Sequence, residues 1–465
     1  MTDQGTLDTA KHPLATGNVG RLLIKFAIPS IIAMLSGALY NIVDQIFIGR
    51  GVGILGNAAT NVALPLVTVC TSVGLLLGIG GASNYSLQLG RGNRDEAGRI
   101  VANAITLSAV GGVVICVAAR AMLGQVLASF GATENVMPYA VSYTGITSLG
   151  MPFLVMTISG GHLIRADGSP KYSMFCVLVG AILNTVLDPI FIFVLDMGIA
   201  GAAWATVLSQ FVGWIFAVRY LLNYRGVKLY KRYFIPNHRR ISAIASLGAA
   251  SCFNQFAMMC VQIALNNTLS YYGSLSRYGG DIPLAAAGVI TKVNMIFLSV
   301  VIGLAQGGQP IIGFNYGARN YARVIQTFRF TLSIATALSV FAFVMFQCFP
   351  REIISLFGRG TEDYYHFVER YFRIFLFMTF TNGIQPVTAN FFTSIGKATR
   401  GFFISLTRQI LFLLPLIIIF PMYWGIDGIM YAGPVADLAA AILAAAFIVN
   451  EIVEIRRLEQ AAHSA

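Results

Sequence analysis

The 465-residue chain has very few charged residues. Only 11% of its positions are Asp, Glu, Lys or Arg, whereas 56% are hydrophobic. Because soluble globular proteins carry about 25% charged residues, this shortage excludes an ordinary soluble domain and places most of the chain in lipid. The apolar residues run for roughly 20 positions at a time, long enough to span a membrane as helices. Clear examples are residues 26–43, 58–79, 100–119, 174–195 and 330–349.

Several other features are missing. The apolar runs do not alternate with polar residues at a period of two, which excludes a membrane β-barrel. The six cysteines lie in apolar stretches without CxxC spacing, so we expect small buried side chains there. The polar first residues contain no apolar signal region, and we expect no cleaved signal peptide. The sequence predicts an all-α polytopic membrane protein with no cofactor and no structural metal.

The positive charges are unevenly distributed along the chain, whose net charge is +12. Lys and Arg crowd alternate connections between apolar runs, around residues 91–99, 165–171, 225–240, 319–323, 397–400 and 456–457. By the positive-inside rule, these connections and both termini lie in the cytoplasm. The basic balance therefore indicates topology and contact with the lipid bilayer, and not nucleic-acid binding. We expect a multi-pass protein of the bacterial cytoplasmic (inner) membrane.

The chain also contains an internal repeat. Residues 81–93 (GASNYSLQLGRGN) are echoed at 308–320 (GQPIIGFNYGARN), and Gly198-Ile-Ala-Gly201 returns as Gly425-Ile-Asp-Gly428, both at an offset of 227 residues. The echoes predict about twelve transmembrane helices in two pseudo-symmetric six-helix lobes, an arrangement typical of transporters. We expect an N-terminal tail (1–16), an N-lobe (17–222), a basic linker (223–240), a C-lobe (241–453) and a C-terminal tail (454–465).

Acidic residues inside the membrane are costly and indicate functional sites by default. Asp44 ends the segment Leu39-Tyr-Asn-Ile-Val-Asp44, and Asp188 lies in Asn184-Thr-Val-Leu-Asp188-Pro189. Asn184 and Asp188 share one helix face, and Pro189 can free nearby carbonyl groups. Such oxygens suit a proton or a hard monovalent cation, although an aspartate at the membrane interface can also cap a helix or pair with arginine. The C-half spans are nearly free of acid, so we expect ion coupling in the N-half.

Two more acids are candidates for a position inside the membrane. Asp196 follows one such run, and Asp437 lies within another. Lys292 and Arg408 are themselves unusual in apolar runs, and we expect Asp437 to form a structural ion pair with one of them.

A pocket for varied ligands needs adaptable apolar walls and a few polar groups. Methionine is flexible and polarisable, and amides inside apolar helices are hard to explain by packing alone. For any single residue, ordinary helix packing is the alternative. The candidate substrate-binding residues are Tyr40, Gln255, Met259, Met295, Gln306, Gln309, Asn382 and Asn390.

Several segments together resemble one transporter family. In the N-half they are Leu39-Tyr-Asn-Ile-Val-Asp44, Leu163-Ile-Arg-Ala-Asp-Gly168-Ser-Pro-Lys171, Asn184-Thr-Val-Leu-Asp-Pro189 and Gly201-Ala-Ala-Trp-Ala-Thr206. In the C-half they are Gln309-Pro-Ile-Ile-Gly-Phe-Asn-Tyr-Gly317 and Ser405-Leu-Thr-Arg-Gln409. Their order and spacing over nearly the whole chain resemble the multidrug and toxic compound extrusion (MATE) family, in its bacterial DinF/MepA-like branch.

This resemblance implies a V-shaped monomer that is not an enzyme and exports small amphipathic, often cationic organic compounds, driven by H+ or Na+. It also implies a cation site made by Asp44, Asn184, Asp188, Thr206 and Tyr143, with Na+ held by the first four if sodium is the coupling ion. One departure from the family pattern is that residues 158–162 are Ile-Ser-Gly-Gly-His instead of carrying asparagines. Another is that the seventh span has no glutamate. His162 would serve either as a proton carrier or at a helix end.

Two other functions are alternatives to an exporter. A flippase for lipid-linked saccharides shares the two-lobe plan, but needs a cavity rich in arginine to bind pyrophosphate. A membrane-embedded enzyme needs a nucleophile, a base and an orienting group in proximity. No HExxH or GxSxG pattern is present in the sequence. The residues leave the substrate and the choice between H+ and Na+ open.

Overall fold

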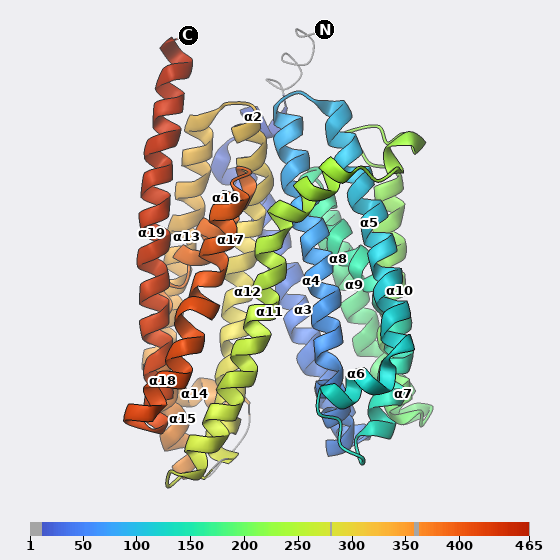
Figure 1. Ribbon diagram of the computed structural model, residues 1–465, viewed down its shortest axis with the longest axis vertical. Coiled ribbons are helices and arrows are strands. Elements are labelled where there is room, and N and C mark those ends of the chain that lie inside the picture. Colours follow the sequence, from blue (N-terminus) through green and yellow to red (C-terminus); the bar gives the residue numbers. More distant parts are fainter. Residues whose placement is uncertain (1–11, 280, 358–361, 465) are drawn as a thin grey trace.

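The structure of the protein is a computed structural model, and it describes residues 12–279, 281–357 and 362–464. Throughout these residues the regular elements are helices (Figure 1). The N-lobe contains α3 (Val19–Gly51), α4 (Ile54–Gly90), α5 (Arg94–Ala121), α6 (Leu123–Ser129), α7 (Met137–Thr147), α8 (Met151–Ala166), α9 (Pro170–Pro189) and α10 (Gly198–Leu222). The C-lobe contains α11 (His238–Ser274), α12 (Asp281–Gly317), α13 (Tyr321–Cys348), α14 (Pro350–Ser355), α15 (Glu362–Phe375), α16 (Ile384–Ser394), α17 (Ala398–Leu406), α18 (Leu414–Trp424) and α19 (Ile426–Ser464).

Within the described residues, 11 helical stretches are long and apolar enough to cross a membrane. Six of them lie in the N-lobe, where α7 continues into α8 and α9 into the π-helical turn η2 (Ile190–Val194). The remaining span expected in the C-lobe is α15, followed by the 3-10 turn η4 (Thr379–Thr381) and α16. It falls short because α15 is strongly charged and its helix is interrupted before α16 begins.

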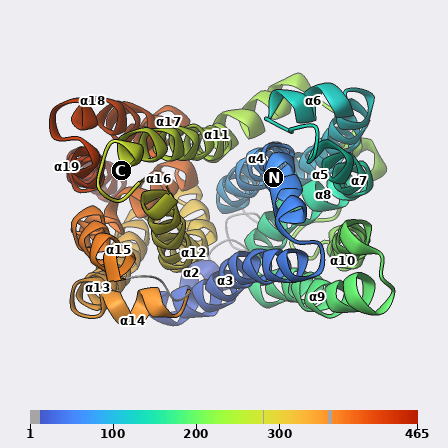
Figure 2. The ribbon, with the colours of Figure 1, turned by 90° about the horizontal axis from the view of Figure 1, so that it is seen from below.

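The two lobes diverge from a common end to form a V (Figure 1). Seen from below, one group of helices contains α3 to α10 and the other α11 to α19 (Figure 2). The short helix α2 (Pro13–Thr16) and the last turns of α19 lie at the same end of the bundle, called here the terminal end (top of Figure 1). The connections α5–α7, α14–α15 and α18–α19 lie at the opposite end.

The internal repeat reappears as matched structural positions. Gly90 and Gly317 are the last residues of α4 and α12, the corresponding long helices of the two lobes. Gly198 and Gly425 both have positive φ, 54° and 57°, at the turns that lead into the sixth span of each lobe. Glycine is favoured there because an L-residue with a Cβ is strained in this region. The repeat therefore encodes equivalent helix ends.

The lobes meet in a seam of close helix crossings near the terminal end. A Cβ added at Gly248 of α11 would overlap the carbonyl oxygen of Leu76, and one at Gly80 would overlap that of Ile244. The same holds for the repeat glycines. A Cβ added at Gly90 would overlap the carbonyl oxygen of Phe314, and one added at Gly317 would overlap that of Leu87. Glycine is required because the backbones approach too closely for any side chain.

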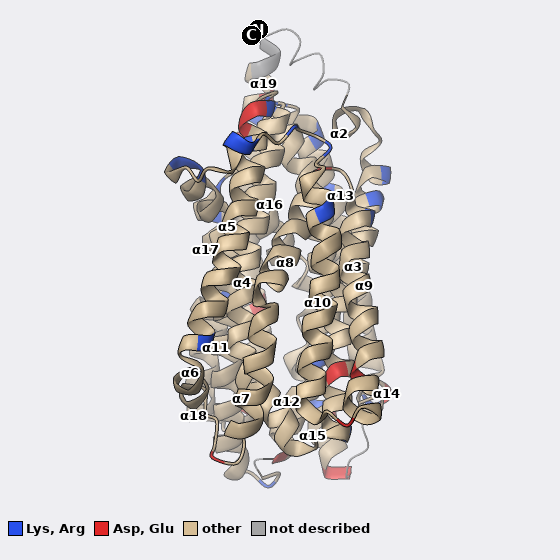
Figure 3. Cartoon of the chain, turned by 90° about the vertical axis from the view of Figure 1, so that its right-hand side faces the viewer, with Lys and Arg blue, Asp and Glu red and all other residues tan. Residues whose placement is uncertain are grey.

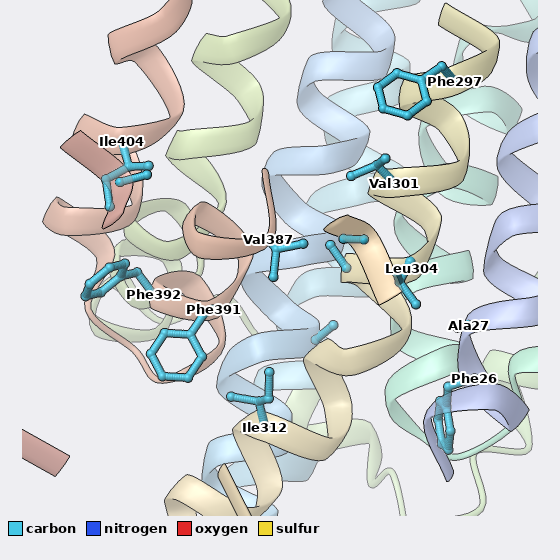
Figure 4. Packing of buried hydrophobic residues seen from close by; sticks show 14 of the residues in the cluster. Phe26, Ala27, Phe297, Val301, Leu304, Ile312, Val387, Phe391, Phe392 and Ile404 are labelled. Carbon is cyan, nitrogen blue, oxygen red and sulfur yellow. The ribbon is translucent and has the colours of Figure 1, made fainter. Parts of the chain in front are cut away.

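Buried apolar side chains fill the space beside this seam. Leu304 and Ile312 of α12 lie beside Val387 and Phe391 of α16 (Figure 4). Phe26 of α3 lies near α12. Phe391 also contacts Phe328 of α13, with ring centroids 4.8 Å apart. The core thus joins α12 to both lobes and fixes the terminal end of the V.

Two helices extend into the segments expected as linker and tail. Helix α11 begins at His238, inside the expected linker, and α19 runs without a break through most of the expected C-terminal tail. The extension of α19 is held because Glu451 is fully buried between Lys397, at 2.7 Å, and Arg400. These charges follow α16 and open α17, so the ion pairs tie α19 to the neighbouring span.

The linker itself is anchored by Asp167, in the loop between α8 and α9. Its carboxylate accepts hydrogen bonds from the Tyr85 and Tyr220 hydroxyls (3.1 and 2.8 Å) and from the backbone N–H groups of Arg225 and Gly226 (3.0 and 2.8 Å). Burial raises the pKa of Asp167, and these hydrogen bonds act in the opposite direction. Asp167 therefore links three spans to the start of the linker.

Candidate functional site: a carboxyl pair beside two adjoining cavities

Two carboxyl groups come together inside the N-lobe. Asp44 lies in the second half of α3, and Asp188 lies one residue before the end of α9, which packs against α3. Asp44 is 9% exposed and Asp188 is fully buried. Their side chains are near enough to interact directly with each other. Two carboxylates at such a distance repel when both are ionised, so the pair favours a proton or a cation between them.

The end of α9 is shaped by its own sequence. Asn184 and Asp188 lie on one face, and the Asn184 side-chain N–H donates to Asp188 Oδ1 at 3.2 Å. Pro189 then ends the regular helix, because proline has no N–H to continue the ladder. The five residues after it form the π-helical turn η2. Such turns are frequent at functional sites because they disturb regular backbone pairing.

The pair lacks a basic partner. Among the residues that the structure describes, no Lys, Arg or His side chain lies within ion-pair distance of Asp44 or Asp188. Three buried oxygens, Asp44 Oδ1, Asp188 Oδ2 and Asn184 Oδ1, have no hydrogen-bond donor within that part of the chain. Buried polar atoms are normally satisfied, and oxygens of this kind are the ligands of hard cations and the acceptors of protons. The arrangement can therefore hold either.

Two further residues expected at this site are nearby. Tyr143 of α7 interacts electrostatically with Thr206 of α10 and with both Asp44 and Asp188. Tyr40, one turn before Asp44 on α3, also lies close to both carboxyl groups. The structure thus brings the five residues of the expected cation site together, with Tyr40 beside them.

A cavity of about 380 Å³ opens next to this cluster in the N-lobe. Tyr40, Asn184 and Thr206 are part of its wall. A second cavity of about 430 Å³ lies in the C-lobe. The two adjoin, because they share the wall residues Met34, Leu75, Gln255, Met295 and Ser299.

Both cavities lie on the side of the seam away from the terminal end. On α3 the close contacts to α12 occur at Ala27 and Ile31, and the cavity wall continues from Met34 towards Asn41. On α11 the contact at Gly248 precedes the wall residues, which run from Ala250 to Leu265. The lobes are therefore closed at the terminal end and enclose the cavities beyond it.

The expected substrate-binding residues divide between cavity and seam. Tyr40 lines the N-lobe cavity, Gln255 and Met295 line both, and Gln306, Asn382 and Asn390 line the C-lobe cavity. Gln309 lies elsewhere: it is buried in the seam, where its side-chain N–H donates to Ser83 Oγ at 2.6 Å. Met259 is not part of either wall, and its neighbour Met258 lines the C-lobe cavity instead. The preceding residue along a helix faces about 100° away, which the sequence pattern alone did not resolve.

The other unusual charges have clear places. Arg408 Nε lies 2.6 Å from Asp437 Oδ1, so Arg408 and not Lys292 is the partner of Asp437. Asp196 is exposed in the turn before α10 and has a φ of 51°. His162 is buried in α8, where its Nδ1 accepts from Arg165 Nη2 at 2.9 Å, since arginine can only donate. While this bond is present Nδ1 has no free lone pair, which argues against His162 as a proton carrier in this conformation.

Sequence reasoning missed the roles of Glu451 and Asp167. Glu451 follows a long apolar run near the end of the expected C-lobe, and nothing next to it in the sequence indicates a partner. The sequence did contain one signal for Glu451. Lys397 and Arg400 have no acidic residue near them in the sequence, so their partner has to come from a distant segment. Asp167 reads as a loop residue, and its four hydrogen bonds come from segments 53 to 82 residues away.

Comparison with known proteins decides the family. A family model described as MatE matches residues 29–190 and 250–419, one block in each lobe. The chain belongs to this family of transporters. The two matched blocks of this MATE protein contain Asp44 and Asp188 in the first and the C-lobe cavity helices α12 and α16 in the second.

Relatives of this MATE protein are transport proteins by name. "Multidrug export protein MepA" from Staphylococcus aureus (strain MSSA476) is 23% identical over 427 residues, covering 92% of each chain. A "FAD transporter" from Shewanella oneidensis is 23% identical over 449 residues, covering 93% of this chain and 95% of the relative.

Solved structures show the same fold. A MATE protein crystallised in complex with MaL6 superposes with a TM-score of 0.89 at 23% identity, over 98% of this chain and 100% of the other. An outward-facing multidrug resistance MATE transporter of the MOP superfamily superposes with a TM-score of 0.88 at 22% identity, over 98% and 99%. The expected V-shaped, two-lobed helical fold and MATE membership are thereby confirmed.

Proposed function

We propose that this MATE transporter is a secondary active exporter, which moves amphipathic, often cationic organic compounds outward while H+ or Na+ moves inward. The observation that carries this proposal is the pair Asp44 and Asp188, which is buried in the N-lobe, has no basic partner among the described residues and adjoins the cavity. An uncompensated pair of acids in the membrane needs a mobile positive charge.

The exchange follows from electrostatics. When a proton or Na+ neutralises the pair, the cavity beside it loses its attraction for an organic cation, and the bound compound is released. When the inward cation leaves, the charged pair attracts the next compound. Because the two occupants compete for the same negative charge, each lowers the affinity for the other.

The orientation is also part of the proposal. Lys and Arg residues, coloured blue in Figure 3, are concentrated at the terminal end, which supports a cytoplasmic position of both termini in a bacterial inner membrane. The seam then closes the cytoplasmic side, and the cavities face outward. Alternating access requires the seam to open and the other end to close. We propose that a single chain suffices, because both cavities are built from one chain.

Proteoliposomes with purified protein test this function. Rhodamine B ethyl ester, a permanently cationic dye, serves as the substrate, and a pH gradient and a sodium gradient are imposed separately. We expect one of the two gradients to drive dye transport. Asp44→Asn should lower the driven rate by at least about tenfold, the factor that corresponds to about 1.4 kcal/mol of lost coupling.

Asp196→Asn is the matched control, because it removes the same charge from an exposed turn of the same lobe. Its transport rate should equal that of the unchanged protein. If Asp44→Asn transports the dye as fast as this control under either gradient, the assigned role of the pair is wrong. If neither gradient drives any dye, the function itself is wrong.

A further inference from the structure

The ion pair Arg408–Asp437 lies in the wall of the C-lobe cavity, where nothing in the coupling scheme uses it. The distance from Arg408 Nε to Asp437 Oδ1 is 2.6 Å, and the two side chains are 14% and 2% exposed. Arg408 is about ten residues from the start of α17 and Asp437 about a dozen from the start of α19, so both lie deep within their spans.

The Arg408 guanidinium is only partly used. Guanidinium has five N–H donors, and Asp437 engages the single one on Nε. In the described part of the chain, Arg408 forms no other hydrogen bond, ion pair or ring contact. The two Nη groups therefore remain as a fork of donors on a residue that lines the cavity. Such a fork matches the two oxygens of a carboxylate or similar oxyacid group.

The backbone around Arg408 is irregular in a way that suits a binding position. Thr407–Leu413 form the π-helical turn η5 between α17 and α18, so the spans of Asp188 and Arg408 each contain a π turn. Gln409, the next residue in η5, lines the same cavity. A π turn redirects side chains and is frequently found at functional sites.

Other polar groups in the same wall also lack partners. The Tyr371 hydroxyl, on a fully buried side chain, and Gln306 Oε1, on a residue that is 5% exposed, have no hydrogen-bond partner among the described residues. Both residues line the cavity. Unsatisfied buried polar atoms around a cavity indicate groups that a ligand can satisfy. Tyr371 can donate to an acidic group, and Gln306 Oε1 can accept from an N–H group.

The pair is also specific to the C-lobe. At the 227-residue offset of the repeat, Arg408 and Asp437 correspond to Ala181 and Gln210 of the N-lobe. The C-lobe has Leu411 and Pro415 at the positions that match Asn184 and Asp188. Each lobe thus has a charged pair at positions where the other has none. A buried ion pair is a weak stabiliser on its own, so structural clamping is a poor explanation for keeping one beside a cavity.

We propose that Arg408, oriented by Asp437, binds an acidic oxyacid group of the transported compound, so that the substrates include amphiphiles carrying a carboxylate. This inference rests on the proposed export function. It deepens that function by assigning opposite tasks to the two lobes: the N-lobe carboxyl pair attracts positive charge, and the C-lobe fork binds negative charge. A compound with both groups would use both lobes.

Binding of two matched dyes tests the site. Rhodamine B carries a free carboxylate, which is replaced in its ethyl ester by a neutral ester group on the same ring system. Fluorescence anisotropy is measured with the full chain in phosphatidylcholine nanodiscs, without any gradient. The unchanged protein should bind the acid at least about tenfold more tightly than the ester, as expected for a charge-assisted hydrogen-bonded pair. The proposal is overturned if the protein shows no such preference.

The double variant Arg408→Gln, Asp437→Asn replaces the ions by a neutral amide pair and leaves no unpaired charge. Its preference for the acid should fall to about twofold or less, with ester affinity unchanged. Arg277→Gln, which removes an exposed arginine outside the cavity, should retain the full preference. A double variant that still prefers the acid tenfold would contradict the proposal.

Two measurements on the unchanged protein keep the proposal testable if the double variant does not fold. Decanoate should displace rhodamine B while decanamide at the same concentration should not; equal displacement by both would overturn it. Repeating the assay with phosphatidylglycerol in the nanodiscs should leave the preference intact. A preference that vanishes there would assign the site to a lipid headgroup and not to the transported compound. Gradient-driven ester transport in the same preparations reports separately on the export function.

Discussion

The buried carboxyl groups of this protein differ in what balances their charge. Glu451 lies between Lys397 and Arg400, and Asp437 is paired with Arg408. Asp44 and Asp188 have only each other and neutral neighbours among the described residues. The first two carboxyl groups have basic side chains that balance their charge, whereas the last two need a positive charge from outside the protein. This contrast, at the level of single side chains, separates acids that are paired within the protein from the two acids proposed to couple transport to an ion.

Replacing Arg408 alone should lower the stability of the protein more than replacing both Arg408 and Asp437. Arg408→Ala leaves Asp437 ionised and unpaired inside the C-lobe, which typically costs about 3–5 kcal/mol. We expect a lower melting temperature and a reduced yield of folded protein in detergent. Thermal unfolding followed by intrinsic fluorescence measures this effect.

The double variant Arg408→Gln, Asp437→Asn should recover most of the lost stability, because neither ion remains. Equal destabilisation of the single and double variants would show that Asp437 does not carry a buried charge.

At the scale of helices, the glycines in α4, α11 and α12 determine how the lobes close. Gly248→Ala places a methyl group onto the carbonyl oxygen of Leu76, so the seam must separate locally. We expect the variant to shift the population away from the state that is closed at the terminal end. Spin labels are attached at positions 171 and 326, in place of Lys171 and Gln326, in a cysteine-free background. Electron paramagnetic resonance should show that the distances between the two labels shift to larger values.

Gly288→Ala is the matched control, since it adds the same methyl group to a helix of the same lobe with nothing within 4 Å. Its distance distribution should match that of the parent protein. If Gly248→Ala gives the same distribution as this control, the seam does not depend on that contact.

The loop between α8 and α9 should control the order of the linker. Asp167→Ala deprives two hydroxyls and two backbone N–H groups of their acceptor, each lost bond costing about 1–3 kcal/mol at most when the donor stays buried. We expect trypsin to cut the linker at Arg225 or Lys228 several-fold faster. Unchanged cleavage relative to the exposed-site variant Asp196→Ala would contradict the anchoring role.

For the molecule as a whole, composition and the repeat were enough to predict two helical lobes. Span lengths follow from membrane thickness, and the repeated glycines indicate equivalent helix ends. The carboxyl pair was predictable because acids in apolar runs are rare. The seam was not, because Gln309 has the same amide as cavity residues and only three-dimensional packing directs it to Ser83. The partner of Asp437 was likewise a choice between two cations until the helices were placed.

In the proposed mechanism, Asp44 and Asp188 exchange a bound cation for substrate. The most direct test of this exchange is cation release from purified protein in weakly buffered detergent solution, recorded with a pH indicator and, in parallel, a sodium indicator. Adding rhodamine B ethyl ester should release H+ or Na+ from the unchanged protein and from Asp196→Asn, but from neither Asp44→Asn nor Asp188→Asn. Release of the same amount from all four proteins would contradict the account.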